Sequence, residues 1–394
     1  MIVLPLPMHS SGWKLPLLLV MCGAVMATAL AHGPENAVPP APTTTREHLK
    51  QADWWPTRQV TDDSQFAGEQ VCARCHRDIV RTQVTTQMAR TLMPAASSTE
   101  LAAHTGPIFT FGSYRYRIAR GKDAFLLSVS DGARQSSQPL QWAFGSGAIA
   151  QSYLWWEKGQ LYESRFNYFA QLHGFDRTPG RLAAAPVSLE MAEGRKLAEF
   201  EARECYSCHA TALTTTEPLS TVHYQPGVTC EGCHGPGRAH VAAVDAGEDA
   251  ELHIVNPAAL KPALAVDFCG ACHSTPKDAE LMGIVGPLTA RFPAYRLEKS
   301  RCWGQSGAAG LTCFACHNPH RPLERDAAAY DAACLRCHGS GGPGVHESAR
   351  QAACPVGKSR CTSCHMEKIK MAGIHYDFTD HDIRIVKAGA PFPD

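Results

Sequence analysis

Alternating apolar and polar side chains mark residues 104–175 as β-structure. The alternation is regular at Phe125, Leu127 and Val129, and aromatic residues continue it on both sides of a predicted turn at Lys158-Gly159. Period 2 is the spacing of a strand that buries one face. We therefore expect a small antiparallel sheet in this part of the chain.

Two other stretches show helical spacing. Residues 74–93 carry apolar side chains at intervals of one and four positions, which are Ile79, Val80, Val84 and Met88. Such intervals place side chains on one face of a helix. Residues 187–208 are the second predicted helix. Residues 32–65 are rich in Pro and Thr and lack a periodic apolar face, so they predict a flexible leader.

The N-terminus is typical of an export signal. Lys14 precedes an apolar run from Leu17 to Ala31, which ends in the small-residue sequence Ala29-Leu30-Ala31. The run is shorter than the ~20 apolar residues of a membrane-spanning helix. We expect cleavage after Ala31 and a periplasmic or extracytoplasmic protein without a transmembrane segment. The alternatives are an uncleaved anchor and a lipoprotein attached through Cys22.

Charge adds an exclusion. The chain has 37 basic and 37 acidic residues and a formal net charge of zero. Nothing in this balance indicates binding to nucleic acid or to an anionic membrane surface. The 394 residues are enough for two or three domains.

The cysteines supply the chemistry. Of 17 Cys, fourteen belong to seven Cys-x-x-Cys-His motifs. This spacing is the attachment signature of c-type haem, in which two thiols bind the porphyrin covalently and the histidine is the proximal iron ligand. The motifs, numbered one to seven below, are Cys72–Cys75–His76, Cys205–Cys208–His209, Cys230–Cys233–His234, Cys269–Cys272–His273, Cys313–Cys316–His317, Cys334–Cys337–His338 and Cys361–Cys364–His365.

Zinc and redox-dithiol sites are the alternatives for a Cys-x-x-Cys pair. A structural zinc site needs four closed ligands, and a thioredoxin-like site needs one reactive pair near a βαβ unit. Here a histidine follows the second cysteine in all seven motifs. The sequence therefore predicts seven covalently bound haem c groups.

Eleven further histidines follow Ala31 and are candidates for the sixth iron position. His320 lies three residues after His317, and His240 lies six residues after His234. Neither can reach the opposite face of its own porphyrin, so each is a candidate ligand of a neighbouring haem. His346, His375 and His381 are the other candidate distal ligands. His104, His173, His223 and His253 are weaker candidates, and we expect His32 and His48 to be exposed.

These features predict a mostly α and irregular multihaem fold with a haem-dominated core and a small antiparallel β insertion between the first two haems. The expected divisions are a signal peptide at 1–31, a flexible leader at 32–65, a first haem-binding segment at 66–103, the β insertion at 104–186 and a six-haem domain at 187–394. Short steps between motifs predict close packing of haem two with haem three, and of haems five, six and seven. The insertion is interpreted as a cover for haem edges, or alternatively as a substrate- or partner-binding surface.

Cys302 and Cys354 are the thiols left over in the mature chain. An exported protein meets an oxidising compartment, so we expect a disulfide between them. The alternative is two separate buried thiols.

Several segments resemble the cytochrome c-554/c-prime group of multihaem cytochromes. The resemblance covers roughly residues 70–385, and its most specific pieces are Cys-Glu-Gly-Cys-His-Gly-Pro-Gly-Arg-Ala-His (230–240), Cys-His-Asn-Pro-His (316–320) and Thr-Asp-His-Asp-Ile-Arg (379–384). It implies electron transfer in the periplasm. It also implies that His240, and less firmly His320, ligates a neighbouring haem.

The chain departs from this group at two points. Met88 stands where relatives often place a histidine after the first haem helix, which makes Met88 a candidate distal ligand of haem one. The tetratricopeptide repeats that many relatives carry after the closing segment are not present in this sequence.

Two functions are compatible with these residues. The first is a periplasmic electron relay between redox partner proteins, which needs only closely packed haems. The second is a reductase or oxidase of small nitrogen or sulfur compounds, which needs one five-coordinate haem. A haem filament is a third possibility, but no sequence repeat favours it. The sequence therefore favours the relay.

Overall fold

The computed structural model of the protein describes residues 62–180, 184–213, 217–249, 253–303, 310–339, 354, 356–371 and 373–393. The expected signal peptide, most of the expected leader and the candidate ligand His346 lie outside the described residues.

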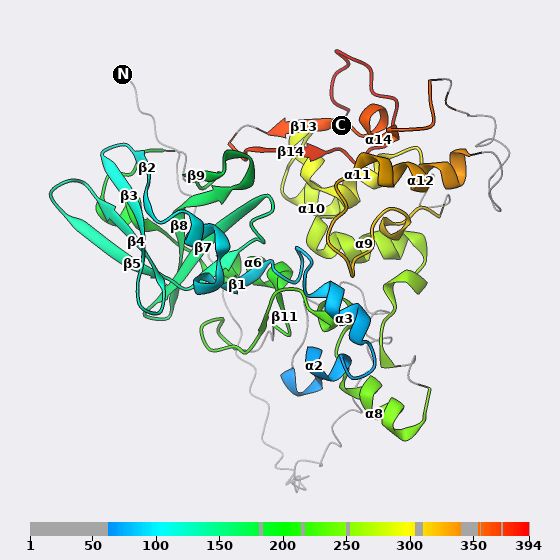
Figure 1. Ribbon diagram of the computed structural model, residues 1–394, viewed down its shortest axis with the longest axis horizontal. Helices are drawn as coiled ribbons and strands as arrows, with labels where there is room; N and C mark the ends of the chain where they lie inside the picture. Colours follow the sequence, from blue (N-terminus) through cyan, green and yellow to red (C-terminus); the bar gives the residue numbers. More distant parts are fainter. Residues whose placement is uncertain are drawn as a thin grey trace, which may run out of the picture. The chain divides into compact units, whose positions relative to one another are not determined.

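A four-stranded antiparallel sheet occupies residues 106–140, the first half of the segment expected to be β-structure (Figure 1). Its order is β2-β3-β4-β5. The strands are β2 (Gly106–Phe111), β3 (Tyr114–Arg120), β4 (Phe125–Ser130) and β5 (Gln135–Leu140). In β4 the buried residues alternate with partly exposed ones, as the period predicted, so Phe125, Leu127 and Val129 all point into the core.

A second sheet of six strands lies against the first. Its order is β1-β6-β7-β8-β10, and β9 also pairs with β8. The bounds are β1 (Leu92–Pro94), β6 (Trp142–Phe144), β7 (Ala150–Glu157), β8 (Gln160–Phe169), β9 (Gly174–Arg177) and β10 (Gly194–Lys196). Lys158 and Gly159 connect β7 to β8 and have φ values of 49° and 75°. Positive φ at both positions is the geometry of a tight hairpin turn, so the predicted turn is confirmed.

The largest apolar core lies in this β region. It contains Tyr116, Ile118 and Leu127 from the four-stranded sheet together with Tyr153, Trp155 and Phe166 from the six-stranded sheet. The side chains come from both sheets and no prosthetic group is needed to close this core, which is typical of two packed sheets.

The predicted fold class is therefore wrong. Among the described residues fourteen strands form four sheets, so the chain is not a mostly α fold, and its β region is not small. Two patterns concealed the strands. In β8 residues 164–169 are buried on both faces, so period 2 is lost there. Within the helix expected over 187–208, β10 separates two short helices.

The helices of the described residues are short. Those before the third motif are α2 (Glu69–Cys72), α3 (Arg77–Gln83), α4 (Thr99–Ala103), α5 (Leu189–Glu193) and α6 (Glu199–His209). From the third motif onward the helices are α7 (Cys230–His234), α8 (Arg238–Ala246), α9 (Pro262–His273), α10 (Pro276–Leu281), α11 (Pro293–Lys299), α12 (Ala327–His338) and α14 (Cys361–His365). Of the helix expected over residues 74–93, only α3 is helical, and strand β1 begins at Leu92, inside the expected range.

Short turns and strand pairs complete the described chain. The 3-10 turns are η1 (Asp63–Gln65), η2 (Ala95–Ser97), η3 (Ala170–Leu172), η5 (Pro257–Ala259), η6 (Gly286–Arg291) and η8 (Cys313–Ala315). Two strand pairs, β11 (Ala210–Thr211) with β12 (Gln225–Pro226) and β13 (Lys368–Met371) with β14 (Tyr376–Thr379), are antiparallel. Across the described ranges, no helix has the length and apolar character to cross a membrane.

Candidate haem-binding sites

Most motifs form the last turn of a helix. The helices α6, α7, α9, α12 and α14 all end at the motif histidine, and α7 and α14 consist of the motif alone. In a helical turn, positions i, i+3 and i+4 lie on one face. Both thiols and the imidazole of each such motif are therefore on the same side, which is the arrangement that one porphyrin requires. The residues present fit haem c.

Two of the motif histidines have one ring nitrogen within hydrogen-bond distance of a backbone carbonyl oxygen. Nδ1 of His234 lies 2.6 Å from the Val255 carbonyl oxygen, and Nδ1 of His209 lies 2.9 Å from the carbonyl oxygen of Thr91. A donated Nδ1–H leaves Nε2 with its lone pair free for a metal. Burial lowers the pKa of both imidazoles, so each is held in the neutral form that a metal ligand requires.

Two pairs of histidine rings lie close to each other, with interplanar angles of 7° for His234 with His320 and 43° for His317 with His381. The ring centroids of His234 and His320 are 5.9 Å apart, and those of His317 and His381 are 6.3 Å apart. Metal–nitrogen bonds to imidazole are about 2.0–2.1 Å long, so two imidazoles on opposite sides of one metal have centroids about 6 Å apart. Both pairs combine a motif histidine with a histidine from another part of the chain.

His240 lies on α8, beside the first motif. Arg74, inside that motif, forms an ion pair with Asp245 of α8 at 3.8 Å, and the guanidinium of Arg238 donates to the carbonyls of Ser64 and Phe66. The charges of His76 and His240 both act on His234, so the three imidazoles lie in one neighbourhood.

His375 and His104 use their ring nitrogens elsewhere. His375 Nε2 lies 2.8 Å from Asp176 Oδ2, which connects the end of β13–β14 to β9. His104 contacts the carbonyl oxygens of Glu100 and His173 through Nδ1 and Nε2 respectively.

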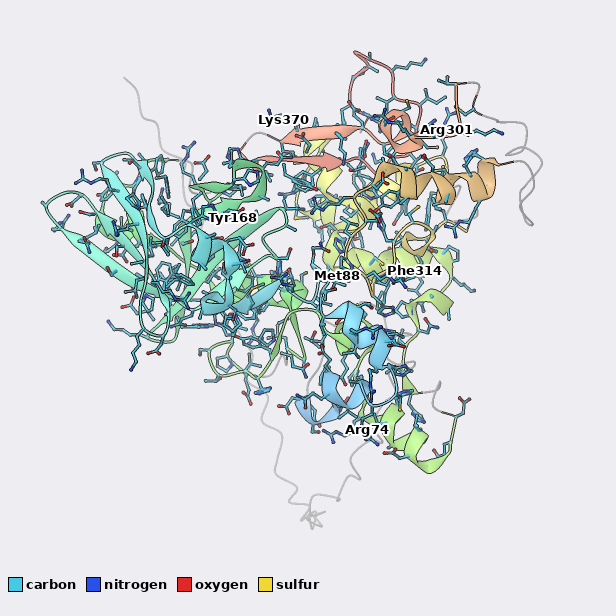
Figure 2. All side chains as sticks on the ribbon, viewed as in Figure 1. Arg74, Met88, Tyr168, Arg301, Phe314 and Lys370 are labelled. Carbon is cyan, nitrogen blue, oxygen red and sulfur yellow. The ribbon has the colours of Figure 1, made fainter. Side chains whose placement is uncertain are left out.

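Met88 is partly buried, and its segment packs against the chain that leads into the third motif (Figure 2). Its carbonyl oxygen accepts a hydrogen bond from the Val228 amide at 3.0 Å. Gly227 precedes Val228 with φ of 80°, and a Cβ there would lie 2.0 Å from the Ala89 carbonyl oxygen. The close approach of the two segments therefore requires glycine at position 227.

Thiols from different motifs lie near enough to influence each other's pKa in three places. A hydrogen bond with Cys230 lowers the pKa of Cys72, and a hydrogen bond with Cys269 lowers that of Cys313. Burial raises the pKa of Cys334, on which the thiols of Cys316 and Cys361 also act. Motif one thus adjoins motif three, four adjoins five, and six adjoins both five and seven. The first haem site, distant in sequence from the others, is not isolated in space.

Further contacts place motif two and motif three beside motif four. The Cys208 thiol lies 3.8 Å from the Ala271 carbonyl oxygen, within the fourth motif. Burial lowers the pKa of His273, and both His317 and His209 contribute to this shift. The Cys233 thiol in turn adds to the raised pKa of Cys269, whose first cause is the hydrogen bond with Cys313.

Glu231 has a role that the sequence did not reveal. It is an x residue of the third motif and is only 1% exposed. Its carboxylate accepts hydrogen bonds from the amides of Ala67, Gly68 and Gly237, at 2.7, 2.9 and 2.7 Å. Gly68 and Gly237 are the N-cap residues of α2 and α8. One side chain therefore ties the helices of the first motif and of His240 to the third motif. Only its position inside the motif distinguished it in the sequence.

Cys302 and Cys354 are both free thiols, so the predicted disulfide is wrong. Cys302 is partly buried, and burial is the first cause of its raised pKa, to which Cys337 of the sixth motif also contributes. Cys354 is exposed. The disulfide was predicted because these two cysteines belong to no haem motif, and that argument says nothing about how far apart they lie.

Comparison with known proteins gives a family match and one similar solved structure. Residues 180–235, which contain motifs two and three, match the family described as cytochrome c554 and c-prime. The match supports a multihaem c-type cytochrome with covalently bound haem. Electron transfer is the activity that such a cytochrome suggests. A solved structure, the crystal structure of outer cell wall cytochrome OcwA, is similar with a TM-score of 0.49 and 14% identity over 82% of this chain and 80% of that chain. No curated protein matches the sequence.

Proposed function

We propose that the mature protein is an exported heptahaem c-type cytochrome that relays electrons between redox partner proteins outside the cytoplasm. The observation that carries this proposal is the continuity of contacts between motifs. Motifs one, three, four, five, six and seven adjoin one another in that order, and motif two adjoins motif four. A relay needs such an unbroken series, whereas a single catalytic haem does not.

The residues that hold the haems follow from the sites described above. The motif thiols provide attachment, and His76, His209, His234, His273, His317, His338 and His365 are the proximal ligands. Haem bound at these motifs supplies one-electron exchange at iron. The protein's contribution is to fix the orientation and protonation of each imidazole, as the Thr91 and Val255 carbonyls do for His209 and His234.

Three distal ligands are included in the proposal. His320 serves the haem of the third motif and His381 that of the fifth, because their ring centroids lie from those of His234 and His317 at the separation expected across one metal. His240 serves the haem of the first motif, because Arg74 and Arg238 fix α8 beside that motif. Each of the three comes from a segment outside the motif that it serves, so the ligands also connect neighbouring haem sites.

Haem count and spin state test the proposal. The intact mass of protein from the extracytoplasmic fraction should equal the apoprotein, cleaved after Ala31, plus seven haems. Chemical reduction should then reduce all seven haems. The reduced protein should not turn over nitrite, hydroxylamine or sulfite. Five or fewer haems in well-matured protein would contradict the heptahaem assignment. Steady turnover of one of these compounds at a carbon monoxide-binding haem would favour the reductase instead.

A further inference from the structure

A buried group of charged side chains surrounds the residue proposed to ligate the fifth haem. Arg296 of α11 and Asp380, which follows β14, are both 0% exposed. Asp380 and Asp382 flank His381 in the sequence. Burying a guanidinium is unfavourable unless its donors are satisfied, so the partners of Arg296 show what it stabilises.

All of the Arg296 nitrogens are used on the C-terminal segment. Nε and Nη2 donate to the two carboxylate oxygens of Asp380 at 2.7 and 3.0 Å, and Nη2 also lies 3.3 Å from Asp382 Oδ2. Nη1 donates to the carbonyl oxygen of Pro393 at 2.9 Å. The ring of Phe392 covers the guanidinium, with its centroid 4.4 Å away. Such a two-pronged contact fixes orientation as well as distance.

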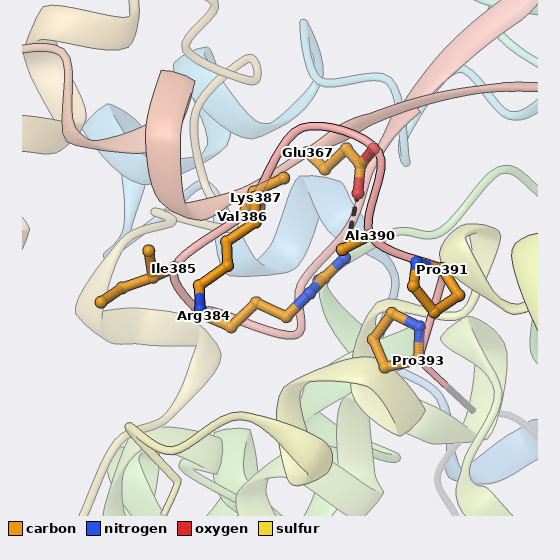
Figure 3. Close-up of a pocket in the computed structure, with 8 residues that line it drawn as sticks. All are labelled: Glu367, Arg384, Ile385, Val386, Lys387, Ala390, Pro391 and Pro393. Atoms are coloured by element: carbon orange, nitrogen blue, oxygen red, sulfur yellow. Dashed lines mark hydrogen bonds and ion pairs between the residues drawn. The ribbon is translucent and has the colours of Figure 1, made fainter.

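The same segment is fastened to the seventh motif by its backbone. The amide of Asp380 donates to the Glu367 carbonyl at 2.8 Å, and the amide of Arg384 donates to the His365 carbonyl at 3.1 Å. The Arg384 guanidinium forms an ion pair with Glu367 at 3.0 Å, beside a surface pocket of about 230 Å³ (Figure 3). Residues 380–384 are therefore held from two sides, by α11 and by the chain next to α14.

His381 lies at the centre of this arrangement. Its Nδ1 is 3.0 Å from the Thr379 carbonyl oxygen, and its ring centroid lies 6.3 Å from that of His317, with the two planes inclined at 43°. Turning the ring away requires the backbone at 380–382 to move, and Arg296 opposes that movement through both neighbouring carboxylates. The hydrogen bonds of Arg296 described above go to Asp380, Asp382 and Pro393, so none of them joins it to the ring of His381 or His317.

We propose that Arg296 is a positioning residue that keeps His381 on the distal side of the haem at the fifth motif. The inference rests on the proposed function, in which His381 is that ligand. It adds that the ligand's place depends on a planar guanidinium in α11, 84 positions away in the sequence from Asp380.

The test compares Arg296→Met, Arg296→Lys and His381→Ala in the mature haem-loaded protein. Lys299→Met is the matched control, because Lys299 is an exposed cation on the same helix. Intact mass gives the haem number, and carbon monoxide binding with electron paramagnetic resonance gives the number of haems that lack a sixth ligand. Added imidazole is expected to restore a missing ligand.

If the inference holds, His381→Ala opens one haem and Arg296→Met opens the same one, with all seven haems still attached. The double variant opens no further haem, imidazole reverses the change, and Lys299→Met behaves as the parent protein. Arg296→Lys keeps the positive charge but cannot donate from two nitrogens to both Asp380 oxygens, so it opens only a fraction of the haem. It also provides the readout should the Met variant fail to mature.

Two other outcomes have distinct meanings. If His381→Ala opens a haem but neither Arg296 variant does, the positioning role is overturned while the ligand assignment stands. If His381→Ala opens none, the ligand assignment itself fails. Opening of several haems in Arg296→Lys, without rescue by imidazole, would show a general packing role and would also overturn the inference.

Discussion

Glu231 illustrates how much one side chain of a haem motif can contribute to structure. Its carboxylate receives three backbone N–H groups that belong to the start of two other helices. Negative charge at a helix N-terminus is favourable, because the free N–H groups there carry partial positive charge.

Replacing Glu231 by Ala should lower the free energy of unfolding by at least about 3 kcal/mol, because three hydrogen bonds to a charged group are lost, each contributing about 1.5–3 kcal/mol, and their buried partners would be left unsatisfied. Glu231→Gln keeps one acceptor oxygen and should be milder. Denaturant unfolding of the haem-loaded protein measures both. Glu204→Ala, an exposed change on α6, is the control. A loss below about 0.5 kcal/mol, the range of ordinary surface substitutions, would disprove this role.

Met88 and His240 are alternative candidates for the distal ligand of the haem proposed at the first motif. The contacts of α8 with the first motif favour His240, while the family resemblance pointed to position 88. His240→Ala should therefore open one haem to carbon monoxide, and Met88→Ala should leave the spectrum unchanged.

The opposite result would assign the ligand to Met88. A thioether raises the potential of a haem relative to imidazole, so Met88→His should then lower one reduction potential. Potentiometric titration of the two single variants, with the parent protein beside them, distinguishes the cases.

At the scale of elements, Asp331 joins the helices of the last two motifs. It lies on α12, and its carboxylate accepts hydrogen bonds from the amides of Arg360 and Cys361 at 2.6 and 2.8 Å, at the start of α14. These N–H groups hold the pKa of Asp331 below its usual value.

The direction of that shift gives a pH prediction. A lowered pKa in the folded state means that the contact stabilises the fold above the unfolded pKa of about 3.9, and that the stabilisation is lost as the pH falls through the folded value. Asp331→Asn should thus reduce the melting temperature at neutral pH, and the difference from the parent should shrink below about pH 4. Calorimetry over this range measures it. A difference that is constant with pH would exclude an ionised carboxylate at this contact.

Local patterns predicted local structure well. The alternation at Phe125, Leu127 and Val129 gave β4, and Lys158-Gly159 gave the hairpin turn, because both depend on residues near in sequence. Local patterns failed at β8, where burial on both faces removes the alternation. They also failed at β10, a short strand that exists because Gly194 to Lys196 pair with β8.

The candidate sites divide in the same way. The motif residues were predictable because the attachment chemistry fixes their spacing. The reasoning for His320 used only chain length, and the structure brings that residue to His234. The contacts of Cys72 with Cys230 and of Arg296 with Asp380 join segments that no spacing rule relates, so the sequence could not predict them.

For the molecule as a whole, the contacts between motifs predict a branched series. Motif four adjoins motifs two, three and five, so it is a junction of the proposed series. Motif two contacts this junction and lies beside Thr91, next to β1, and its His209 carbonyl oxygen accepts a hydrogen bond from the Gly227 amide, three residues before motif three, at 3.0 Å.

Removing the two attachment sites should have unequal effects. Cys269→Ser with Cys272→Ser should slow electron exchange between the first and last haems, whereas Cys205→Ser with Cys208→Ser should leave it nearly unchanged. Flash photoreduction from a label near motif one, followed at the haem of motif seven, measures the exchange. Intact mass must show six haems in both variants. Equal slowing in the two would refute the branched order.

The contact between Glu231 and the start of α2 also bears on how the protein is made. Ala67 and Glu231 are 164 positions apart in the sequence. Contacts between distant positions form late, since a long loop must close first. A chain synthesised from its N-terminus therefore presents Cys72 and Cys75 long before the residue that caps their helix exists. We therefore expect the first motif to be unfolded when it becomes available for haem attachment. Its folded surroundings can form only after the third motif has been synthesised.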